Sequence, residues 1–198
     1  MTHFSNQLKV YKNILFLIYF FSSLITQGHS LEKTKELGTM SSLRGQDLLT
    51  KQKIQIESKP LGLVIIFLSA KCPCSNSHIA EIKTLSKEFS QFQFVAVHSN
   101  KEEELSLAQN YFKSLDLSFP IIEDDNFSLA DQFQAMKTPH AFVFNTKGEL
   151  QFKGGVSDSR QFANSEIKYL RLALEDVAAQ KKLRYPHART LGCAITRD

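Results

Sequence analysis

The sequence predicts an α/β fold with a mixed central sheet, and two patterns carry this prediction. First, short runs of β-branched and aromatic residues alternate along the chain with longer amphipathic segments, as in folds whose helices cover a sheet. Second, residues 141–153 form two strand-like runs joined by turn residues at 145–148, which predicts an antiparallel hairpin. No stretch within residues 45–180 resembles an interdomain linker, so we expect one domain there.

Each element follows from a local pattern of apolar residues. Residues 53–57 alternate between polar and apolar, which is typical of a half-buried strand, whereas residues 61–68 form a continuous apolar run typical of a strand buried on both faces. Apolar side chains recur at helical spacing from Ile79 to Phe89. The predicted strands span residues 53–57, 61–68, 92–98, 119–122, 141–144 and 149–153. The predicted helices span residues 75–91, 101–115, 127–135 and 160–179.

The first 30 residues have the pattern of a secretory signal peptide. Lysines precede an apolar stretch at residues 14–25, which is shorter than the roughly 20 apolar residues of a membrane-spanning helix. We expect residues 1–30 to be a cleaved signal peptide or an N-terminal membrane anchor, and residues 31–44 to be a polar linker. Either form predicts export of the domain, to the periplasm or the extracellular space.

The charge pattern argues against nucleic acid as a partner. The formal net charge is +4 at pH 7, and no stripe of Lys and Arg follows a predicted element. Residues 181–198 are basic and contain the third cysteine, Cys193, in what we expect to be a C-terminal tail outside the domain. Acidic runs at residues 102–104 and 123–125 are read as a helix start and a solvated turn, and no chemistry is assigned to them.

The cysteines are the strongest indication of function. In an exported chain, three cysteines can form one disulfide and one free thiol, or exchange partners. Cys72 and Cys74 are separated by one residue, so a bridge between them would restrict the unfolded chain little and stabilise the fold little. Both lie where a helix is predicted to begin, whose free N–H groups and dipole favour a thiolate, and Lys71 adds a neighbouring positive charge. We therefore expect Cys72 to be a reactive thiol.

These residues resemble the reactive centre of the thioredoxin superfamily. The resemblance rests on a buried strand that ends in residues 67–72, a helix directly after it, and the Thr138-Pro139 pair before a later strand. The longer layout resembles the redoxin branch, related to alkyl hydroperoxide reductase and thiol-specific antioxidant proteins, and residues 192–195 resemble the tails of some redoxin-type proteins. The resemblance implies a thioredoxin-like fold whose mixed sheet of about five strands is flanked by helices on both faces.

The resemblance also implies thiol–disulfide oxidoreductase activity. The Cys72 thiolate would attack a substrate disulfide, while Pro139, in a cis peptide bond, and the backbone around Thr138 would hold the substrate. The expected partners are a disulfide-containing protein or a small thiol, together with a thiol electron donor or acceptor. No cofactor is expected in this interpretation.

The chain departs from the family pattern at the second cysteine. Ser75 stands where the usual resolving cysteine would be, and Cys74 comes one position early. Three outcomes stay open: Cys72 pairs with Cys74 in a strained ring, one of these two pairs with Cys193, or Cys72 acts alone. A strained ring would raise the reduction potential of the pair.

A thiol peroxidase of the peroxiredoxin type is one alternative function. In that family a proline and a hydroxyl residue precede the reactive cysteine at fixed spacing. Here Ser69 fits the hydroxyl position, but Ile65 stands in place of the proline. No arginine lies close enough in sequence to complete a peroxide pocket, so the sequence argues against efficient peroxidase activity.

A copper- or zinc-binding chaperone on the same scaffold is the other alternative. The imidazole of His78 follows the two thiols in sequence, and His140 follows the Thr138-Pro139 pair. Thiolates and imidazoles suit Cu(I) or Zn(II). The candidate ligands in this interpretation are Cys72, Cys74, His78 and His140.

Overall fold

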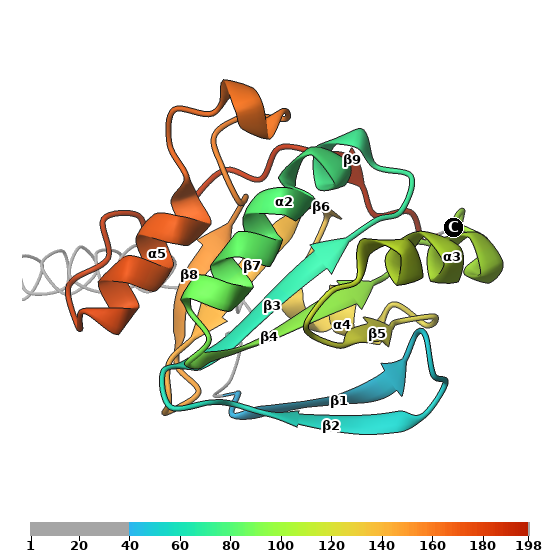
Figure 1. The fold of residues 1–198 in the computed structure, drawn as a ribbon, viewed down its shortest axis with the longest axis horizontal. Coiled ribbons are helices and arrows are strands. Elements are labelled where there is room, and N and C mark those ends of the chain that lie inside the picture. The colour runs from blue at the N-terminus through green and yellow to red at the C-terminus, as the bar shows by residue number, and fades with distance from the viewer. Residues whose placement is uncertain (1–39, 198) are drawn as a thin grey trace, which may run out of the picture. The chain divides into compact units, whose positions relative to one another are not determined.

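The computed structural model describes residues 40–197, which form a seven-stranded mixed sheet and a second sheet of two short strands (Figure 1). The order in the large sheet is β2-β1-β5-β4-β3-β7-β8, and β3 runs parallel to β4 and antiparallel to β7.

The strands of the large sheet are β1 (Ser42–Asp47), β2 (Lys53–Glu57), β3 (Gly62–Leu68), β4 (Phe92–His98), β5 (Ile121–Glu123), β7 (His140–Phe144) and β8 (Leu150–Gly154). The small sheet pairs β6 (Lys137–Thr138) with β9 (Cys193–Ala194). The helices are α2 (Pro73–Glu88), α3 (Leu105–Leu115), α4 (Ser128–Phe133) and α5 (Tyr169–Ala178), with a short 3-10 helix η1 (Phe162–Asn164).

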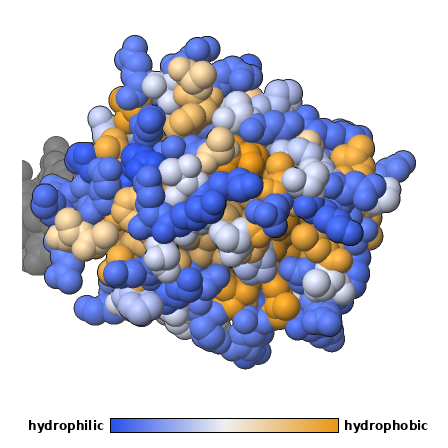
Figure 2. All heavy atoms as spheres, viewed as in Figure 1, coloured by the Kyte–Doolittle hydropathy of each residue, from blue (hydrophilic) through white to orange (hydrophobic). Residues whose placement is uncertain are grey.

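Strand β3 is central to the core because all seven of its residues are buried. Alternate side chains, such as Ile66, share one apolar cluster with α2, α3 and α5, and the others, such as Phe67, share a second cluster with α4. The Phe67 ring lies 5.7 Å from Phe133 of α4 and 5.9 Å from Phe142 of β7, measured between centroids. Helices thus cover both faces of the sheet, and the predicted thioredoxin-like α/β fold is confirmed, with a wider sheet than expected. On the face that Figure 2 shows, mostly hydrophilic side chains surround smaller apolar areas.

Several predicted boundaries need correction. Strand β1 begins at Ser42, so the last residues of the predicted linker belong to the sheet. Helix α3 begins only at Leu105, which places residues 102–104 before the helix, and the last helix is limited to Tyr169–Ala178. The predicted signal or anchor at residues 1–30 lies outside the described residues. Within residues 40–197, no helix is both long and apolar enough to cross a bilayer.

The C-terminal segment is part of the domain, which corrects its prediction as a separate tail. It runs alongside β8, where the Ala188 N–H donates to the Lys153 carbonyl oxygen at 3.0 Å. It then reaches β6, where β9 places Cys193 opposite Thr138 (Figure 1). Gly192 allows this approach, because a Cβ atom there would lie 1.9 Å from the Thr138 carbonyl oxygen.

Candidate active site

The turn between β3 and α2 holds Cys72 at a helix N-terminus, as the sequence predicts. Cys72 is the N-cap residue of α2, and Pro73 takes the first helical position, where its missing N–H is not needed. The Ser75 N–H donates to Cys72 Sγ at 3.4 Å, and the Cys72 N–H donates to Ser69 Oγ at 3.0 Å. The thiol is buried, with 2% of the residue exposed. The turn therefore fixes the sulfur where free helix N–H groups favour negative charge.

The Thr138-Pro139 pair lies against this sulfur. Its peptide bond is cis, as the resemblance implies, and Cys72 Sγ lies 3.2 Å from the Thr138 carbonyl oxygen. The two sites are 66 positions apart in the chain. They meet because β3 and β7 are neighbours in the sheet, with Phe67 opposite His140.

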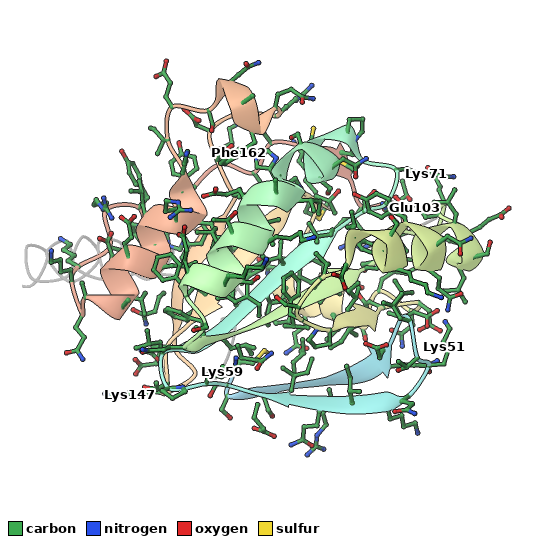
Figure 3. The ribbon with its side chains drawn as sticks, in the orientation of Figure 1. Lys51, Lys59, Lys71, Glu103, Lys147 and Phe162 are labelled. Atoms are coloured by element: carbon green, nitrogen blue, oxygen red, sulfur yellow. The ribbon has the colours of Figure 1, made fainter. Side chains whose placement is uncertain are left out.

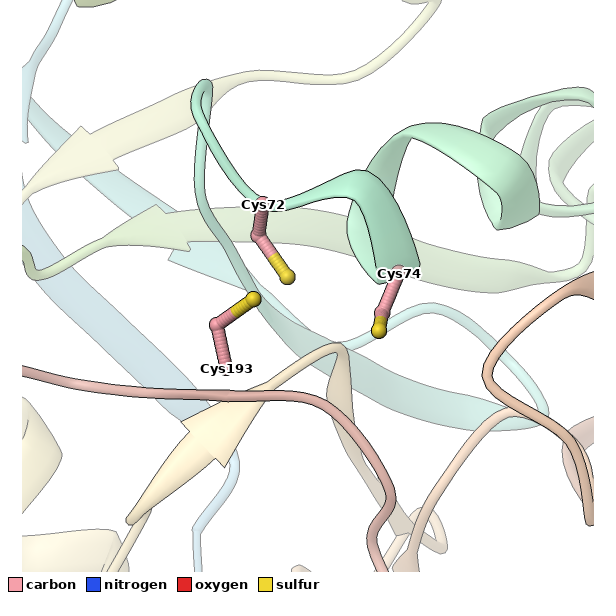
Figure 4. Close-up of side chains that lie close together, drawn as sticks. All are labelled: Cys72, Cys74 and Cys193. Atoms are coloured by element: carbon pink, nitrogen blue, oxygen red, sulfur yellow. The ribbon is translucent and has the colours of Figure 1, made fainter.

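All three cysteines meet at this point. The sulfurs of Cys72, Cys74 and Cys193 lie within 4.8 Å of one another. Figure 4 shows the Cys72 and Cys193 sulfurs pointing toward one another, with the Cys74 side chain to one side. All three are free thiols in this structure, and the pairing that the sequence left open remains a prediction.

The three sulfurs differ in acidity. Burial opposes ionisation of Cys72, yet hydrogen bonds from the Cys193 thiol and from backbone N–H groups lower its pKa to about 7. Burial and the neighbouring Cys72 raise the pKa of Cys193 to about 12. Burial and the Cys72 charge also raise the pKa of Cys74, although the Arg160 charge opposes this effect. Cys72 is therefore the sulfur of this cluster that ionises first as the pH rises.

The Lys71 side chain extends to the loop that precedes α3. Its ammonium group donates to the Glu102 carbonyl oxygen at 3.2 Å, and Figure 3 shows the side chain beside Glu103 at the edge of α3. The groups that lower the pKa of Cys72 include the Cys193 thiol and backbone N–H groups. The effect of the Lys71 charge on the Cys72 thiol stays a prediction.

Glu103 is a site residue that the sequence analysis missed. Its carboxylate accepts hydrogen bonds from the backbone N–H groups of Ala70 at 2.8 Å and Lys71 at 3.2 Å. It also accepts one from the Ser69 hydroxyl and lies 2.9 Å from His98 Nε2. Burial alone would raise the pKa of Glu103, but these hydrogen bonds lower it to about 2. A buried carboxylate therefore holds the turn that precedes Cys72.

Asn100 connects this carboxylate to the C-terminal segment. Its side-chain amide donates to Glu103 Oε1 at 3.0 Å, and its side-chain oxygen accepts the Thr196 N–H at 3.0 Å. The Lys101 N–H also donates to the Thr196 carbonyl oxygen at 3.3 Å. The loop after β4 thus supports both the turn of Cys72 and the strand of Cys193. In the sequence, the signal for these residues was the run of polar residues that follows the buried strand β4. Because β4 is parallel to β3, both strands end at the same edge of the sheet.

His78 and His140, the two histidines among the predicted metal ligands, do not lie in one group with the cysteine sulfurs. The predicted ligand set is therefore corrected. His78 is buried, with Nδ1 2.7 Å from the Cys74 carbonyl oxygen and Nε2 2.8 Å from Ser157 Oγ. His140 lies against the Phe142 ring at 4.4 Å, and burial lowers its pKa to about 4. Among the described residues, the group of close metal-ligating atoms is the three cysteine sulfurs.

The two positions that the peroxiredoxin pattern concerns, Ile65 and Ser69, have other contacts in the structure. Ile65 is fully buried inside β3. The Ser69 hydroxyl donates to Glu103 and accepts the Cys72 N–H. The hydroxyl that fits the peroxidase pattern therefore has a structural role in the turn.

Comparisons with known proteins agree with this architecture. Residues 62–150 match the model of a family described as Thioredoxin-like. Sporulation thiol-disulfide oxidoreductase A from Bacillus subtilis is 22% identical over 147 residues, which cover 73% of this chain and 86% of that protein. A crystal structure of an uncharacterized conserved protein from Geobacillus kaustophilus has a TM-score of 0.70 at 20% identity, covering 80% of this chain and 89% of that one. A hypothetical protein from Sinorhizobium meliloti gives 0.69 at 20% identity, covering 79% and 91%. The chain therefore has a thioredoxin-like fold, and its residues 62–150 match the Thioredoxin-like family.

Proposed function

We propose that this protein is an exported thiol–disulfide oxidoreductase whose nucleophile is the Cys72 thiolate. The observation that carries the proposal is one buried thiol at a helix N-terminus whose sulfur lies 3.2 Å from the Thr138 carbonyl oxygen, and its lowered pKa supports the same role. A thiolate is the attacking species in disulfide exchange, and a pKa near ambient pH is the optimum for attack. The name of the Bacillus subtilis relative, a thiol-disulfide oxidoreductase, supports the same reaction class.

The reaction needs two exchange steps and no cofactor. In the first, Cys72 Sγ forms a bond to one sulfur of a substrate disulfide, the substrate S–S bond breaks, and the other substrate sulfur leaves as a thiolate. In the second, a resolving cysteine of this chain loses its proton and attacks Cys72 Sγ, which releases the remaining substrate thiolate. The substrate gains two electrons and the chain becomes a disulfide. A thiol donor of lower potential, or the reverse sequence with an acceptor, restores the starting state.

The geometry favours Cys193 as the resolving partner. Its thiol donates a hydrogen bond to Cys72 Sγ, and the two sulfurs point toward one another (Figure 4). Cys74 lies in the first turn of α2, two positions after Cys72, so a bridge between them would close a very short ring. Transfer of the Cys193 proton to the departing substrate thiolate would generate the second nucleophile.

Strand β9 occupies the edge where the resemblance places a substrate. Thr138 and Cys193 lie opposite each other in an antiparallel pair of two-residue strands. Exchange of β9 for another extended segment breaks few backbone hydrogen bonds within this ladder, because each strand has only two residues. In this proposal, an extended substrate segment displaces β9 from β6, and β9 returns when Cys193 resolves the mixed disulfide.

Export is supported by the sequence pattern of residues 1–30, which combines a positive flank with a short apolar core. The compartment in this proposal is the periplasm or the extracellular space, and residues 14–25 anchor the protein to the membrane if the segment is retained. A non-reducing compartment also suits a chain whose function requires disulfide formation.

Reduction of insulin disulfides by the purified protein tests the reaction. Cys72→Ser should abolish activity, because it removes the nucleophile. Cys193→Ser should stop after the first step and accumulate a mixed disulfide on Cys72, detectable by mass spectrometry. Cys74→Ser is the matched control, and it should keep most of the activity. Full activity of Cys72→Ser would overturn the proposal.

A further inference from the structure

The three sulfurs form a donor set that disulfide exchange does not fully use. Cys72 and Cys74 come from the start of α2 and Cys193 from β9, and their sulfurs lie within 4.8 Å of one another. A metal–thiolate bond of about 2.3 Å places three coplanar sulfurs about 4.0 Å apart around one ion. The observed spacing is therefore close to what a shared metal ion requires.

The composition of this set selects the ion. Within residues 40–197, the close group contains three sulfurs and neither a carboxylate nor an imidazole. Soft thiolates favour Cu(I), whereas Zn(II) in protein sites is almost always four-coordinate. Burial of Cys72 and Cys74, with 2% and 7% of each residue exposed, suits an ion that binds without water.

We propose that the reduced protein binds one Cu(I) ion through the sulfurs of Cys72, Cys74 and Cys193. This site goes beyond the proposed oxidoreductase function, because it assigns a role to Cys74, which that function does not need. Binding changes no oxidation state: thiols that are protonated release their protons to solvent as the Cu–S bonds form. A Cys72–Cys193 disulfide removes two of the three donors, so oxidation of the protein releases the ion and Cu(I) in turn blocks the nucleophile.

Competition titration of the fully reduced protein with Cu(I), without oxygen and against a chromophoric Cu(I) chelator, tests the site. We expect one Cu(I) per chain, and X-ray absorption should show three sulfur neighbours. Cys74→Ser should weaken Cu(I) binding by at least about 100-fold, the upper end of the losses seen when outer-shell partners are removed. His78→Asn is the matched control: its amide can replace the contact to the Cys74 carbonyl oxygen, and stoichiometry and sulfur count should not change.

A second experiment measures Cu(I) binding by the oxidised protein. After Cys72–Cys193 disulfide formation, one-to-one binding should be lost and should return on reduction. Coordination of Cu(I) by two sulfurs that does not change in Cys74→Ser would overturn the proposal. So would an imidazole neighbour of the ion that is lost in His78→Asn, and so would the absence of Cu(I) binding. Insulin reduction by Cys74→Ser without copper is independent of these results, so failure of the metal site and failure of the oxidoreductase function are distinguishable.

Discussion

Two parts of the chain supply the groups that make Cys72 reactive. The helix N-terminus contributes the Ser75 N–H, and the C-terminal strand contributes the Cys193 thiol. Both stabilise the thiolate against the opposing effect of burial. Loss of either donor should therefore raise the pKa of Cys72 back toward its ordinary value.

The pH dependence of alkylation measures this pKa directly. The rate of Cys72 carboxamidomethylation by iodoacetamide, followed by peptide mass spectrometry, should rise with a midpoint near pH 7, because the pKa of Cys72 is lowered to about 7. Cys193→Ala, which removes the donor, should move the midpoint upward, whereas Cys74→Ala should not. A wild-type midpoint near pH 9 would contradict this explanation of the site.

Glu103 should stabilise the fold in a pH-dependent way. Its pKa in the folded protein is about 2, below its ordinary value of 4.5. The ionised carboxylate therefore stabilises the fold above pH 4.5, and this contribution is lost as the pH falls toward 2. Glu103→Gln should lower the free energy of unfolding at pH 7 by about 1–3 kcal/mol, since it weakens buried hydrogen bonds. The difference between wild type and variant should shrink as pH falls.

Urea unfolding at pH 7, 4 and 3 checks this prediction, with the exposed neighbour Glu102→Gln as the control. A Glu103→Gln variant as stable as wild type at pH 7 would show that the carboxylate does not support the turn.

Local chemistry made Cys72 predictable and the resemblance to the thioredoxin superfamily made Pro139 predictable, whereas Glu103 required the fold. A cysteine before a predicted helix and a Thr-Pro pair before a strand are visible in a short stretch of sequence. Glu103 lies in an acidic run that fits an ordinary helix start. Only the parallel pairing of β3 with β4 brings it to Ser69.

At the scale of elements, the pairing of β9 with β6 completes the site. The register places Cys193 opposite Thr138, and the buried side chain of Ile195 joins the second apolar cluster. The Ile195 N–H donates to the Met136 carbonyl oxygen at 2.9 Å. The strand is therefore held by packing and by backbone contacts, and its cysteine is positioned before any oxidation.

Gly192→Val tests whether this pairing controls disulfide formation. The added side chain would collide with the Thr138 carbonyl oxygen, so β9 should separate from β6. After mild oxidation, the yield of the Cys72–Cys193 disulfide should fall severalfold, as measured by peptide mapping. Ala194→Ser, at the exposed neighbouring position, should retain the wild-type yield. Equal yields in all three proteins would mean that the pairing has no such role.

Long, strongly patterned elements were predictable, and short or polar ones were not. The continuous apolar run gave β3 almost to the residue, because burial on both faces requires it. Strand β1 has no comparable pattern, and its place between β2 and β5 depends on tertiary pairing. Strand β9 has two residues, too few for any periodicity.

At the scale of the whole molecule, the fold brings distant cysteines to one edge of the sheet. The chain carries Cys72 at the end of the central strand and then returns through its last residues to place Cys193 beside it (Figure 1). The alternation of strands and helices was enough to predict the fold class. The return of the C-terminal segment was not predictable, because its contacts with β6 and β8 are mostly between backbone groups.

The central claim is that Cys72 and Cys193 form the redox couple of this protein. The most direct test is equilibration of the purified protein with glutathione buffers of known potential, with mass spectrometry of the trapped species to identify the bridged cysteines. We predict one two-electron transition in which the Cys72–Cys193 disulfide appears as the dithiol disappears, and no such transition in Cys193→Ser. A transition that links Cys72 to Cys74, or the absence of any couple that includes Cys72, would contradict the claim.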